Sequence, residues 1–225
     1  MTGFAAGTGR RRGERPRRAG TSYAGEVKGP RLYAVITLAL AAMCGAIVVV
    51  VPEPAHLVVR WTARTSLALF ALVYVARPAT QLWPSPLTRG LLARRTWLGL
   101  GFATSHAFHL AGIIGIGWPD PAAFVERRPP NPLGVASFVL LAAMSVTSIN
   151  SIHRRMGRWW RVLHLTGIHV AWIVFAGTYA RNVEAEPAYA LPLALLLAMA
   201  AIRGAAWLRL RRRKRARVAA VRVGA

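Results

Sequence analysis

The sequence predicts an all-α fold, a six-helix transmembrane bundle with both termini in the cytoplasm. Three observations support this prediction. The 225-residue chain is 55% hydrophobic and only 16% charged, and its apolar residues gather into long blocks separated by basic segments. Those blocks have the length of roughly 20 residues that a helix needs to cross a bilayer. A net charge of +23 could by itself indicate a nucleic-acid-binding protein, but the apolar blocks favour an integral membrane protein.

Six apolar blocks can be counted along the chain. The first contains no charged residue and is longer than the apolar region of a signal peptide, about 7 to 15 residues, so we expect it to remain as a helix. The second contains Arg60 and Arg64 and is weaker by hydropathy. The predicted spans are 32–51, 57–76, 97–118, 132–152, 162–180, and a sixth from 187 that fades at 203–207.

The distribution of basic residues supports this topology independently, because Lys and Arg accumulate in cytoplasmic loops. With six spans and both termini inside, 25 of the 30 Lys and Arg residues fall in four inner segments. The outer loops hold three basic residues and five of the seven acidic residues. The inner segments are 1–31, 77–95, 153–161 and 203–225.

Basic segments flank the predicted bundle at both ends of the chain. We expect a disordered tail at 1–30, rich in Gly, Arg and Pro, a membrane domain at 31–208, and a second basic cytoplasmic tail at 209–225. Each cation near an anionic leaflet gains about 1 kcal/mol, so lipids of the inner leaflet of the cell membrane are the expected partners of the tails, and nucleic acid is not.

Four of the six histidines lie within the third and fifth spans: His106, His109, His164 and His169. Ionisable side chains within a bilayer usually face the bundle interior and serve a function. His106 and His109 are one helical turn apart, so both can face one partner helix. His164 and His169 are about 140° apart around the axis and cannot point in one direction. Counted from the cytoplasmic end, His106 and His109 are about 14 to 18 Å deep, His169 about 15 Å and His164 about 7 Å.

Two imidazoles on facing helices at one depth suit a haem iron, which takes a nitrogen on each axial side. Zinc is less suitable, because the spans offer no carboxylate and Cys44 is the only cysteine, which also excludes an intramolecular disulfide and an iron–sulfur cluster. The spacing of the histidines alone also allows two other roles for them, namely proton or ion conduction, and packing without a cofactor. Arg60 and Arg64 could pair with a haem propionate or snorkel to the outer surface.

The glycine cluster Gly112, Gly115 and Gly117 lies inside the third span and follows no strand, so it indicates close helix packing and no dinucleotide site. No strand–glycine–helix pattern occurs elsewhere. We therefore expect no flavin or nicotinamide domain in this chain.

Three stretches resemble the ferric-reductase-like transmembrane domain family, and in particular its MsrQ/YedZ type, the haem-containing membrane subunit that feeds electrons to a periplasmic methionine sulfoxide reductase. "TARTSLALFALVYVARPATQL" at 62–82 resembles the family's "TGRTAL" helix, which ends in Ala-Arg. "LLARRTWLGLGFATSHAFHL" at 91–110 is similar to its "RRxLGLxxFxxxxLHL" pattern, and "SINSIHRRMGRWWRVLH" at 148–164 to its "LGxxWxxLH" entry to helix five. Together these stretches cover about half of the chain.

The resemblance implies roles for individual residues. His109 matches a haem ligand, His164 matches the inner histidine of helix five, and Arg64 matches the arginine of "TGRT". The family has another histidine thirteen residues beyond the first, where this chain has Gly177. His169 has no counterpart in the pattern and could replace the missing ligand, or the chain could hold fewer haems or none.

The sequence therefore predicts a protein with one or two haem b groups and axial ligands among His109, His164 and His169, with His106 as a spare ligand or a neighbouring group. Single electrons would pass across the membrane from quinol or a cytoplasmic flavoprotein to a periplasmic or extracellular acceptor, by resemblance a sulfoxide reductase subunit. Whether the chain is itself an enzyme or only the electron-transfer subunit of an oxidoreductase stays open. The alternative is a haem-free membrane scaffold or small carrier whose histidines are structural.

Overall fold

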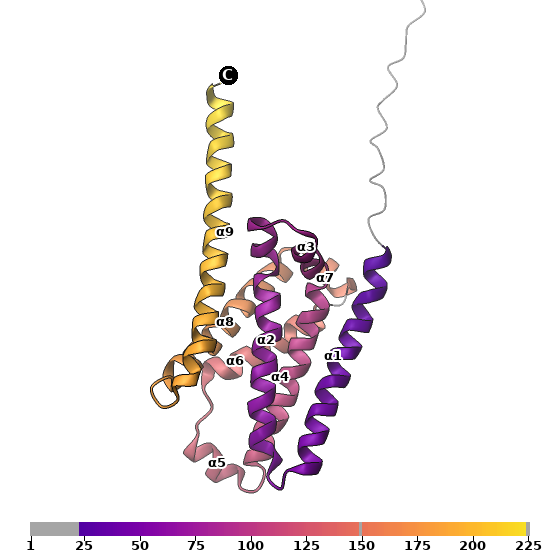
Figure 1. The fold of residues 1–225 in the computed structure, drawn as a ribbon, viewed down its shortest axis with the longest axis vertical. Coiled ribbons are helices and arrows are strands. Elements are labelled where there is room, and N and C mark those ends of the chain that lie inside the picture. Colours follow the sequence, from indigo (N-terminus) through magenta and orange to yellow (C-terminus); the bar gives the residue numbers. More distant parts are fainter. Residues whose placement is uncertain (1–22, 149, 224–225) are drawn as a thin grey trace, which may run out of the picture.

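The computed structural model describes residues 23–148 and 150–223, and within them the chain forms helices and no strand (Figure 1), which confirms the predicted all-α class. Each helix follows its neighbour through a short connection. The elements are α1 (Tyr23–Val50), α2 (Pro54–Leu82), α3 (Pro86–Ala93), α4 (Arg95–Gly117), α5 (Pro121–Arg127), α6 (Pro132–Val146), α7 (Asn150–Met156), α8 (Arg158–Asn182), the 3-10 turn η1 (Pro187–Tyr189) and α9 (Ala190–Val223).

Five stretches of helix in the described part of the chain are long and apolar enough to cross a membrane. They are Gly29–Val50, Pro54–Leu82, Arg95–Gly117, Arg158–Asn182 and Pro187–Ala220. A sixth span is obtained if α5 and α6, which meet at an angle of 117°, are counted together. The chain is thus a multi-pass membrane protein of five to six spans, as the sequence predicts.

Helix α6 is shorter than the span predicted at 132–152. It ends at Val146, and the next two residues bond their hydroxyls back to the last turn of the helix. Thr147 Oγ1 donates to the carbonyl of Ala143 at 2.7 Å, and Ser148 Oγ donates to that of Met144 at 2.8 Å. With 15 residues, α6 is about 22 Å long, which is less than the thickness of the hydrocarbon core.

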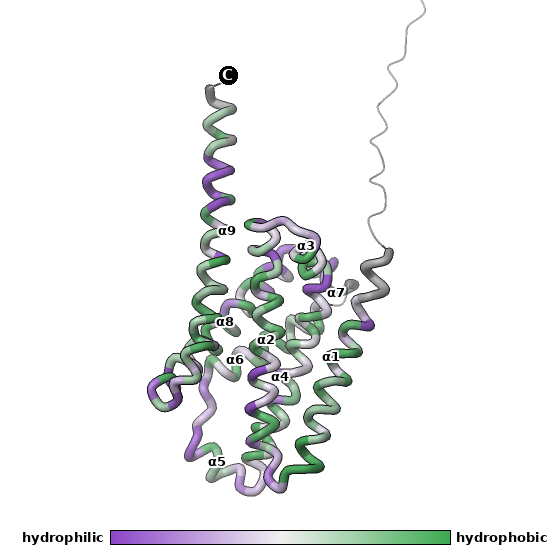
Figure 2. The backbone as a smooth tube through the Cα atoms, viewed as in Figure 1, coloured by the Kyte–Doolittle hydropathy of each residue, from purple (hydrophilic) through white to green (hydrophobic). Residues whose placement is uncertain are grey.

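The basic connections gather at one end of the bundle. Figure 1 shows α3 and α7 at the same end as the amino-terminal end of α1 and the carboxyl-terminal end of α9, whereas α5 lies at the opposite end. We call the first of these the basic end. In Figure 2 the spans are mostly hydrophobic, and the part of α9 that projects beyond the basic end contains a hydrophilic stretch.

The two tails begin elsewhere than the sequence suggests. Helix α1 starts at Tyr23, so residues 23–30 belong to a helix, and α9 continues without a break through the basic segment to Val223. The remainder of the predicted disordered tail, residues 1–22, lies outside the described residues.

Helix α2 is the centre of the bundle, with its most extensive contact on α4 and further contacts on α9 and α1. Small residues bring α2 and α4 close together, as at Gly112, where an added Cβ would lie 2.8 Å from Val59 Cγ2. Phe70, Phe102 and Phe175 join α2, α4 and α8 in one aromatic cluster, with ring centroids 5.3 to 6.2 Å apart. Helix α8 packs mainly on α6 and α9. This arrangement leaves a space between α4 and α8 at the basic end.

Candidate functional site

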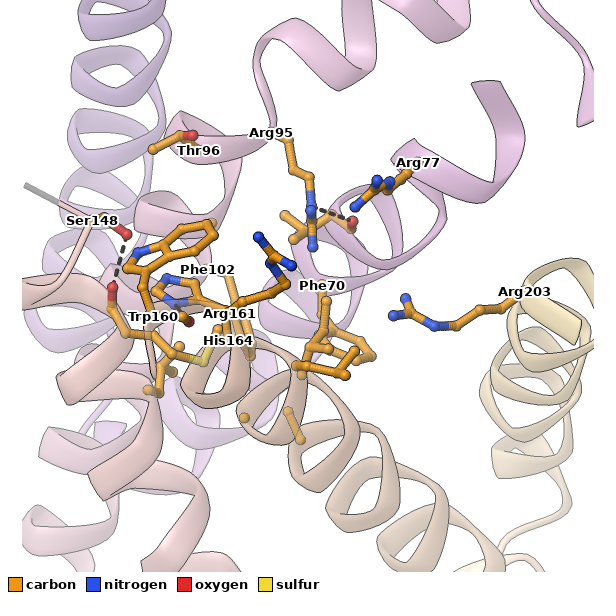
Figure 3. Close-up of a pocket in the computed structure, with 18 of the residues that line it drawn as sticks. Phe70, Arg77, Arg95, Thr96, Phe102, Ser148, Trp160, Arg161, His164 and Arg203 are labelled. Carbon is orange, nitrogen blue, oxygen red and sulfur yellow. Dashed lines mark hydrogen bonds between the residues drawn. The ribbon is translucent and has the colours of Figure 1, made fainter. Parts of the chain in front are cut away.

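A cavity of about 590 Å³ occupies that space and is lined by residues of α2, α4, α6, α7, α8 and α9. Sites for cofactors and small molecules usually measure roughly 300 to 1,000 Å³. Figure 3 shows its lining side chains converging from several helices. The cavity can therefore hold a group of cofactor size.

His164 is the membrane-span histidine that lines this cavity. Its Nδ1 lies 3.0 Å from the carbonyl oxygen of Trp160, one turn earlier on α8. Because a carbonyl oxygen has no proton, Nδ1 carries the hydrogen and donates it. This hydrogen bond fixes the tautomer and leaves on Nε2 the lone pair that a metal ligand needs, while the backbone of Met144 is a further polar neighbour of the ring.

The indole of Trp160 holds the His164 ring in place. The two rings stack with centroids 4.0 Å apart and an interplanar angle of 28°, as Figure 3 shows. Trp160 is itself fixed, because its Nε1 donates to the carbonyl of Thr147 at 3.0 Å, and its other neighbour is the ring of His153 at 4.3 Å. His153 also lines the cavity, which the sequence analysis did not predict.

Four arginines from four helices line the same cavity: Arg77 of α2, Arg95 of α4, Arg161 of α8 and Arg203 of α9. No Asp or Glu is among the described lining residues. In Figure 3 these side chains reach toward a common space. Arg77 and Arg95 lie in two of the stretches that resemble the family, and all four arginines flank the spans at the basic end, but the sequence predicts no binding role for them. This part of the cavity favours an anionic group.

Apolar side chains form the rest of the cavity wall. Phe70, Phe102, Leu141 and Ile168 are buried lining residues. Gly99 also lines the cavity, and a Cβ added there would meet no atom within 4 Å. The cavity therefore combines an apolar wall, a cationic region and two imidazoles, those of His164 and His153.

His106 lies deeper in the bundle and is almost fully buried, with 9% of its surface exposed. Phenyl rings surround it, with centroids at 5.0 Å for Phe102, 5.0 Å for Phe138 and 5.8 Å for Phe175. Its Nδ1 is 3.2 Å from Ser66 Oγ of α2. Aromatic rings thus fill the space beside this imidazole.

A chain of hydroxyls extends from His106 between α2 and α4. Ser66 Oγ donates to Ser105 Oγ at 2.9 Å, and Ser105 Oγ donates to the carbonyl of Thr62 at 3.1 Å. Since the Ser66 proton is used on Ser105, Ser66 accepts from His106 Nδ1. The chain satisfies buried polar groups at the contact between the two helices.

His109 faces the same helix one turn farther along α4. Its Nδ1 donates to the carbonyl of Val59 at 3.1 Å, and its ring stacks on that of His106, with centroids 5.6 Å apart. The prediction that His106 and His109 face one partner helix is confirmed, and that helix is α2. Neither of them lines the cavity at the basic end.

His169 points away from His164, as the spacing predicts. Its Nδ1 donates to the carbonyl of Leu165 at 2.7 Å, and its ring meets that of Tyr74 edge-on at 6.3 Å. It does not line the cavity. The structure thus brings His106 and His109 together, and places His164 and His169 apart from them on two different sides of α8.

Arg64 lies outside the cavity as well. It is exposed, and its guanidinium is 5.2 Å from the centroid of the Trp61 ring, while Arg60 is also exposed. The cationic lining therefore comes from arginines other than the two within the second predicted span.

Residues 62–178 match the family described as the ferric reductase like transmembrane component. Similar proteins include the haem-binding subunits MsrQ of protein-methionine-sulfoxide reductase from Cronobacter sakazakii, 29% identical over 135 residues, and from Enterobacter sp., 30% identical over 136 residues. Each alignment covers 54% of this chain and 66% of the relative, so the chain spans just under two thirds of the length of these relatives. No solved structure matches the chain. Because the match includes more than half of its residues, this chain belongs to the ferric reductase like transmembrane component family.

Proposed function

We propose that the protein is a haem b-binding membrane subunit for electron transfer, with one haem in the cavity at the basic end and His164 Nε2 as an axial ligand. The observation that carries the proposal is a fixed imidazole, that of His164, which lines a cavity of about 590 Å³ and whose Nδ1 is held by a hydrogen bond to the Trp160 carbonyl. The names of the MsrQ relatives, which are haem-binding subunits, support the same cofactor.

The residues present fit this group. His164 offers the nitrogen that haem iron requires, Phe70 and Phe102 offer apolar contacts for a flat macrocycle, and the arginines offer positive charge for its carboxylates. Haem supplies one-electron chemistry when bound. The chain itself supplies the ligand, the burial and the electrostatic environment, which set the reduction potential.

The deeper histidines fit a haem less well. The family resemblance carries a ligand role to His109, but the rings of His106 and Phe138 lie against it at 5.6 and 6.5 Å, and a third ring, that of Phe102, adjoins His106. We therefore propose a haem only at His164. Whether a second haem binds at His109 can be tested by measuring the haem-to-protein ratio of the His109→Ala variant, as described below.

The proposed direction of electron flow follows the charge distribution. The basic end would lie in the cytoplasm, because Lys and Arg accumulate on that side of a cell membrane. Electrons would arrive from quinol or a cytoplasmic flavoprotein and leave toward an acceptor on the other side. The relatives are named as subunits of a methionine sulfoxide reductase, which supports a reductase subunit as that acceptor. Reporter fusions at the carboxyl terminus test this orientation.

The decisive experiment is an absorption spectrum of the purified full chain in its oxidised and reduced forms, with haem quantified per chain. The wild type should show a Soret band, and His164→Ala should lose most of it, because the iron loses its axial nitrogen. His56→Ala is the matched control, since His56 is exposed and lies outside the cavity. His109→Ala should keep one haem per chain.

Three results would contradict the proposal or change it. Full pigment in His164→Ala would show that the haem binds elsewhere. Loss of half of the pigment in His109→Ala would show a second haem at the deeper level. A colourless wild type, purified from cells with ample porphyrin, would instead support a haem-free scaffold or carrier.

A further inference from the structure

We infer that Arg95 and Arg203, with Arg77 and Arg161 beside them, bind the two propionate carboxylates of the haem. This inference rests on the proposed function, because it concerns the same cavity. It moves the anion-binding role from Arg60 and Arg64, for which their position on the second predicted span allowed it, to four arginines at the basic end.

The first argument is the unbalanced charge of the cavity. Four guanidinium groups line one space, and none of the described lining residues is an Asp or Glu. Like charges that converge in a partly buried space repel one another more strongly than at an open surface, because the effective dielectric constant is lower. A bound dianion would remove this repulsion, and a pair of carboxylates matches the geometry of guanidinium groups.

The second argument is that two of these arginines are already held in place. Arg95 Nε donates to the carbonyl of Val73 of α2 at 3.2 Å. This bond leaves both Nη groups of Arg95 free to donate to a carboxylate. Arg203 lies over the ring of Tyr74, 4.8 Å from its centroid. Binding an anion therefore costs little further loss of side-chain freedom.

The third argument is the position of the arginines relative to the ligand. Arg161 precedes His164 by three residues on α8, so the two share one face of the helix. Arg95 is the first residue of α4, at the basic end. A porphyrin held by His164 would thus have this cationic region at one edge, toward the basic end, and apolar walls around the rest. Arg64 is exposed and does not line the cavity.

The test compares haem b with its dimethyl ester, which has the same iron and ring but no charged carboxylates. The purified, haem-free full chain is titrated with each compound, and binding is followed by the Soret band. The wild type should bind haem b about tenfold to hundredfold more tightly than the ester, as expected when charge-assisted hydrogen bonds are lost. In the double variant Arg95→Gln and Arg203→Gln this ratio should fall to near one, with the axial-ligand spectrum unchanged.

Two matched variants control for folding and for overall charge. Arg60→Gln with Arg64→Gln removes the same number of cations from exposed positions of α2 outside the cavity and should keep the wild-type ratio. Arg95→Lys with Arg203→Lys keeps the charge and should restore part of the preference for haem b. Circular dichroism confirms that each variant is helical.

The inference is overturned if the wild type binds the two compounds equally, or if the cavity double variant keeps the wild-type ratio. It is also overturned if the exposed double variant loses the ratio to the same extent, because the preference would then reflect overall charge. A wild type that binds neither compound would contradict the proposed function itself, and this outcome is distinct from the first three.

Discussion

Three of the membrane-span histidines occupy two settings, which differ in whether the imidazole lines the cavity at the basic end. At the basic end, His164 Nδ1 is tied to its own helix and the rest of the ring faces a cavity. At the deeper level, His106 and His109 are tied to α2 and lie among aromatic rings. His106 is the most buried of these histidines, so burial alone would make it the first candidate for a functional residue. The adjoining cavity and its four arginines instead favour His164 as the residue that binds a cofactor.

The deeper setting belongs to the contact between α2 and α4. Lipid is as apolar as the helix surfaces, so membrane helices associate through close packing of small residues and interhelical hydrogen bonds. Gly112 lets the backbones approach, and the chain from His106 through Ser66 and Ser105 provides the hydrogen bonds. These histidines stabilise the bundle, and the bundle in turn fixes the helices around the cavity.

The largest expected effect comes from filling the cavity without touching its polar groups. Gly99→Phe places a phenyl group where an added Cβ has no neighbour within 4 Å, at a position that lines the cavity. We expect nearly complete loss of haem with little change in helix content, because the new side chain takes the space of the macrocycle. Haem per chain and circular dichroism are measured together.

The control for this variant is Gly177→Phe. Gly177 also has no atom within 4 Å of an added Cβ, but it does not line the cavity, so pigment should be retained. Equal loss of haem in both variants would show that the cavity is not the binding site, and the contrast between the two histidine settings would then fail.

A second variant acts on the deeper setting. In Gly112→Ile, the new Cβ would lie 2.8 Å from Val59 Cγ2 and 3.3 Å from the backbone nitrogen of Val59. The helices must move apart, and overpacking of this kind costs about 1 to 3 kcal/mol in the free energy of unfolding. Unfolding in mixed micelles measures the change.

Gly115→Ala is the matched control for Gly112→Ile, because its Cβ would meet Ala55 Cβ at 3.5 Å, an ordinary contact. It should unfold like the wild type. If Gly112→Ile were as stable as Gly115→Ala, the close approach of α2 and α4 would contribute little to the stability of the bundle.

Much of the fold follows from the sequence, because the length of an apolar block and the position of cations depend on local composition. The spans at 57–76 and 162–180 correspond to α2 and α8, which are somewhat longer. The end of α6 could not be predicted in this way, since the helix ends at Val146, six residues before the predicted end of that span.

The candidate site was predictable only in part. His164 is identified by its resemblance to a family motif, and the spacing correctly predicts that His169 points elsewhere. The depth of a residue along its helix does not define its neighbours, however, because these depend on the rotation of every helix in the bundle. Two of the arginines at the cavity illustrate this limit, since in the sequence Arg161 and Arg203 look like other cations at the ends of spans, such as Arg154.

The smallest expected effect separates two histidines at similar depth. In His106→Leu, Ser66 loses its donor inside the α2–α4 contact, and we expect a loss of about 1 to 2 kcal/mol in the free energy of unfolding. In His169→Leu, an exposed hydrogen bond within α8, to the Leu165 carbonyl, and an edge contact to Tyr74 are lost, so the cost should be smaller, about 0.5 kcal/mol.

Both leucine variants should keep their haem, because neither residue lines the cavity. The measurement pairs unfolding in mixed micelles with the Soret absorbance of the same preparations. If His169→Leu lost its pigment while His106→Leu kept it, His169 would be a ligand, and α8 would have to rotate on haem binding. His169 would then replace His164 as the proposed ligand, because the two residues cannot both face one iron from a straight helix.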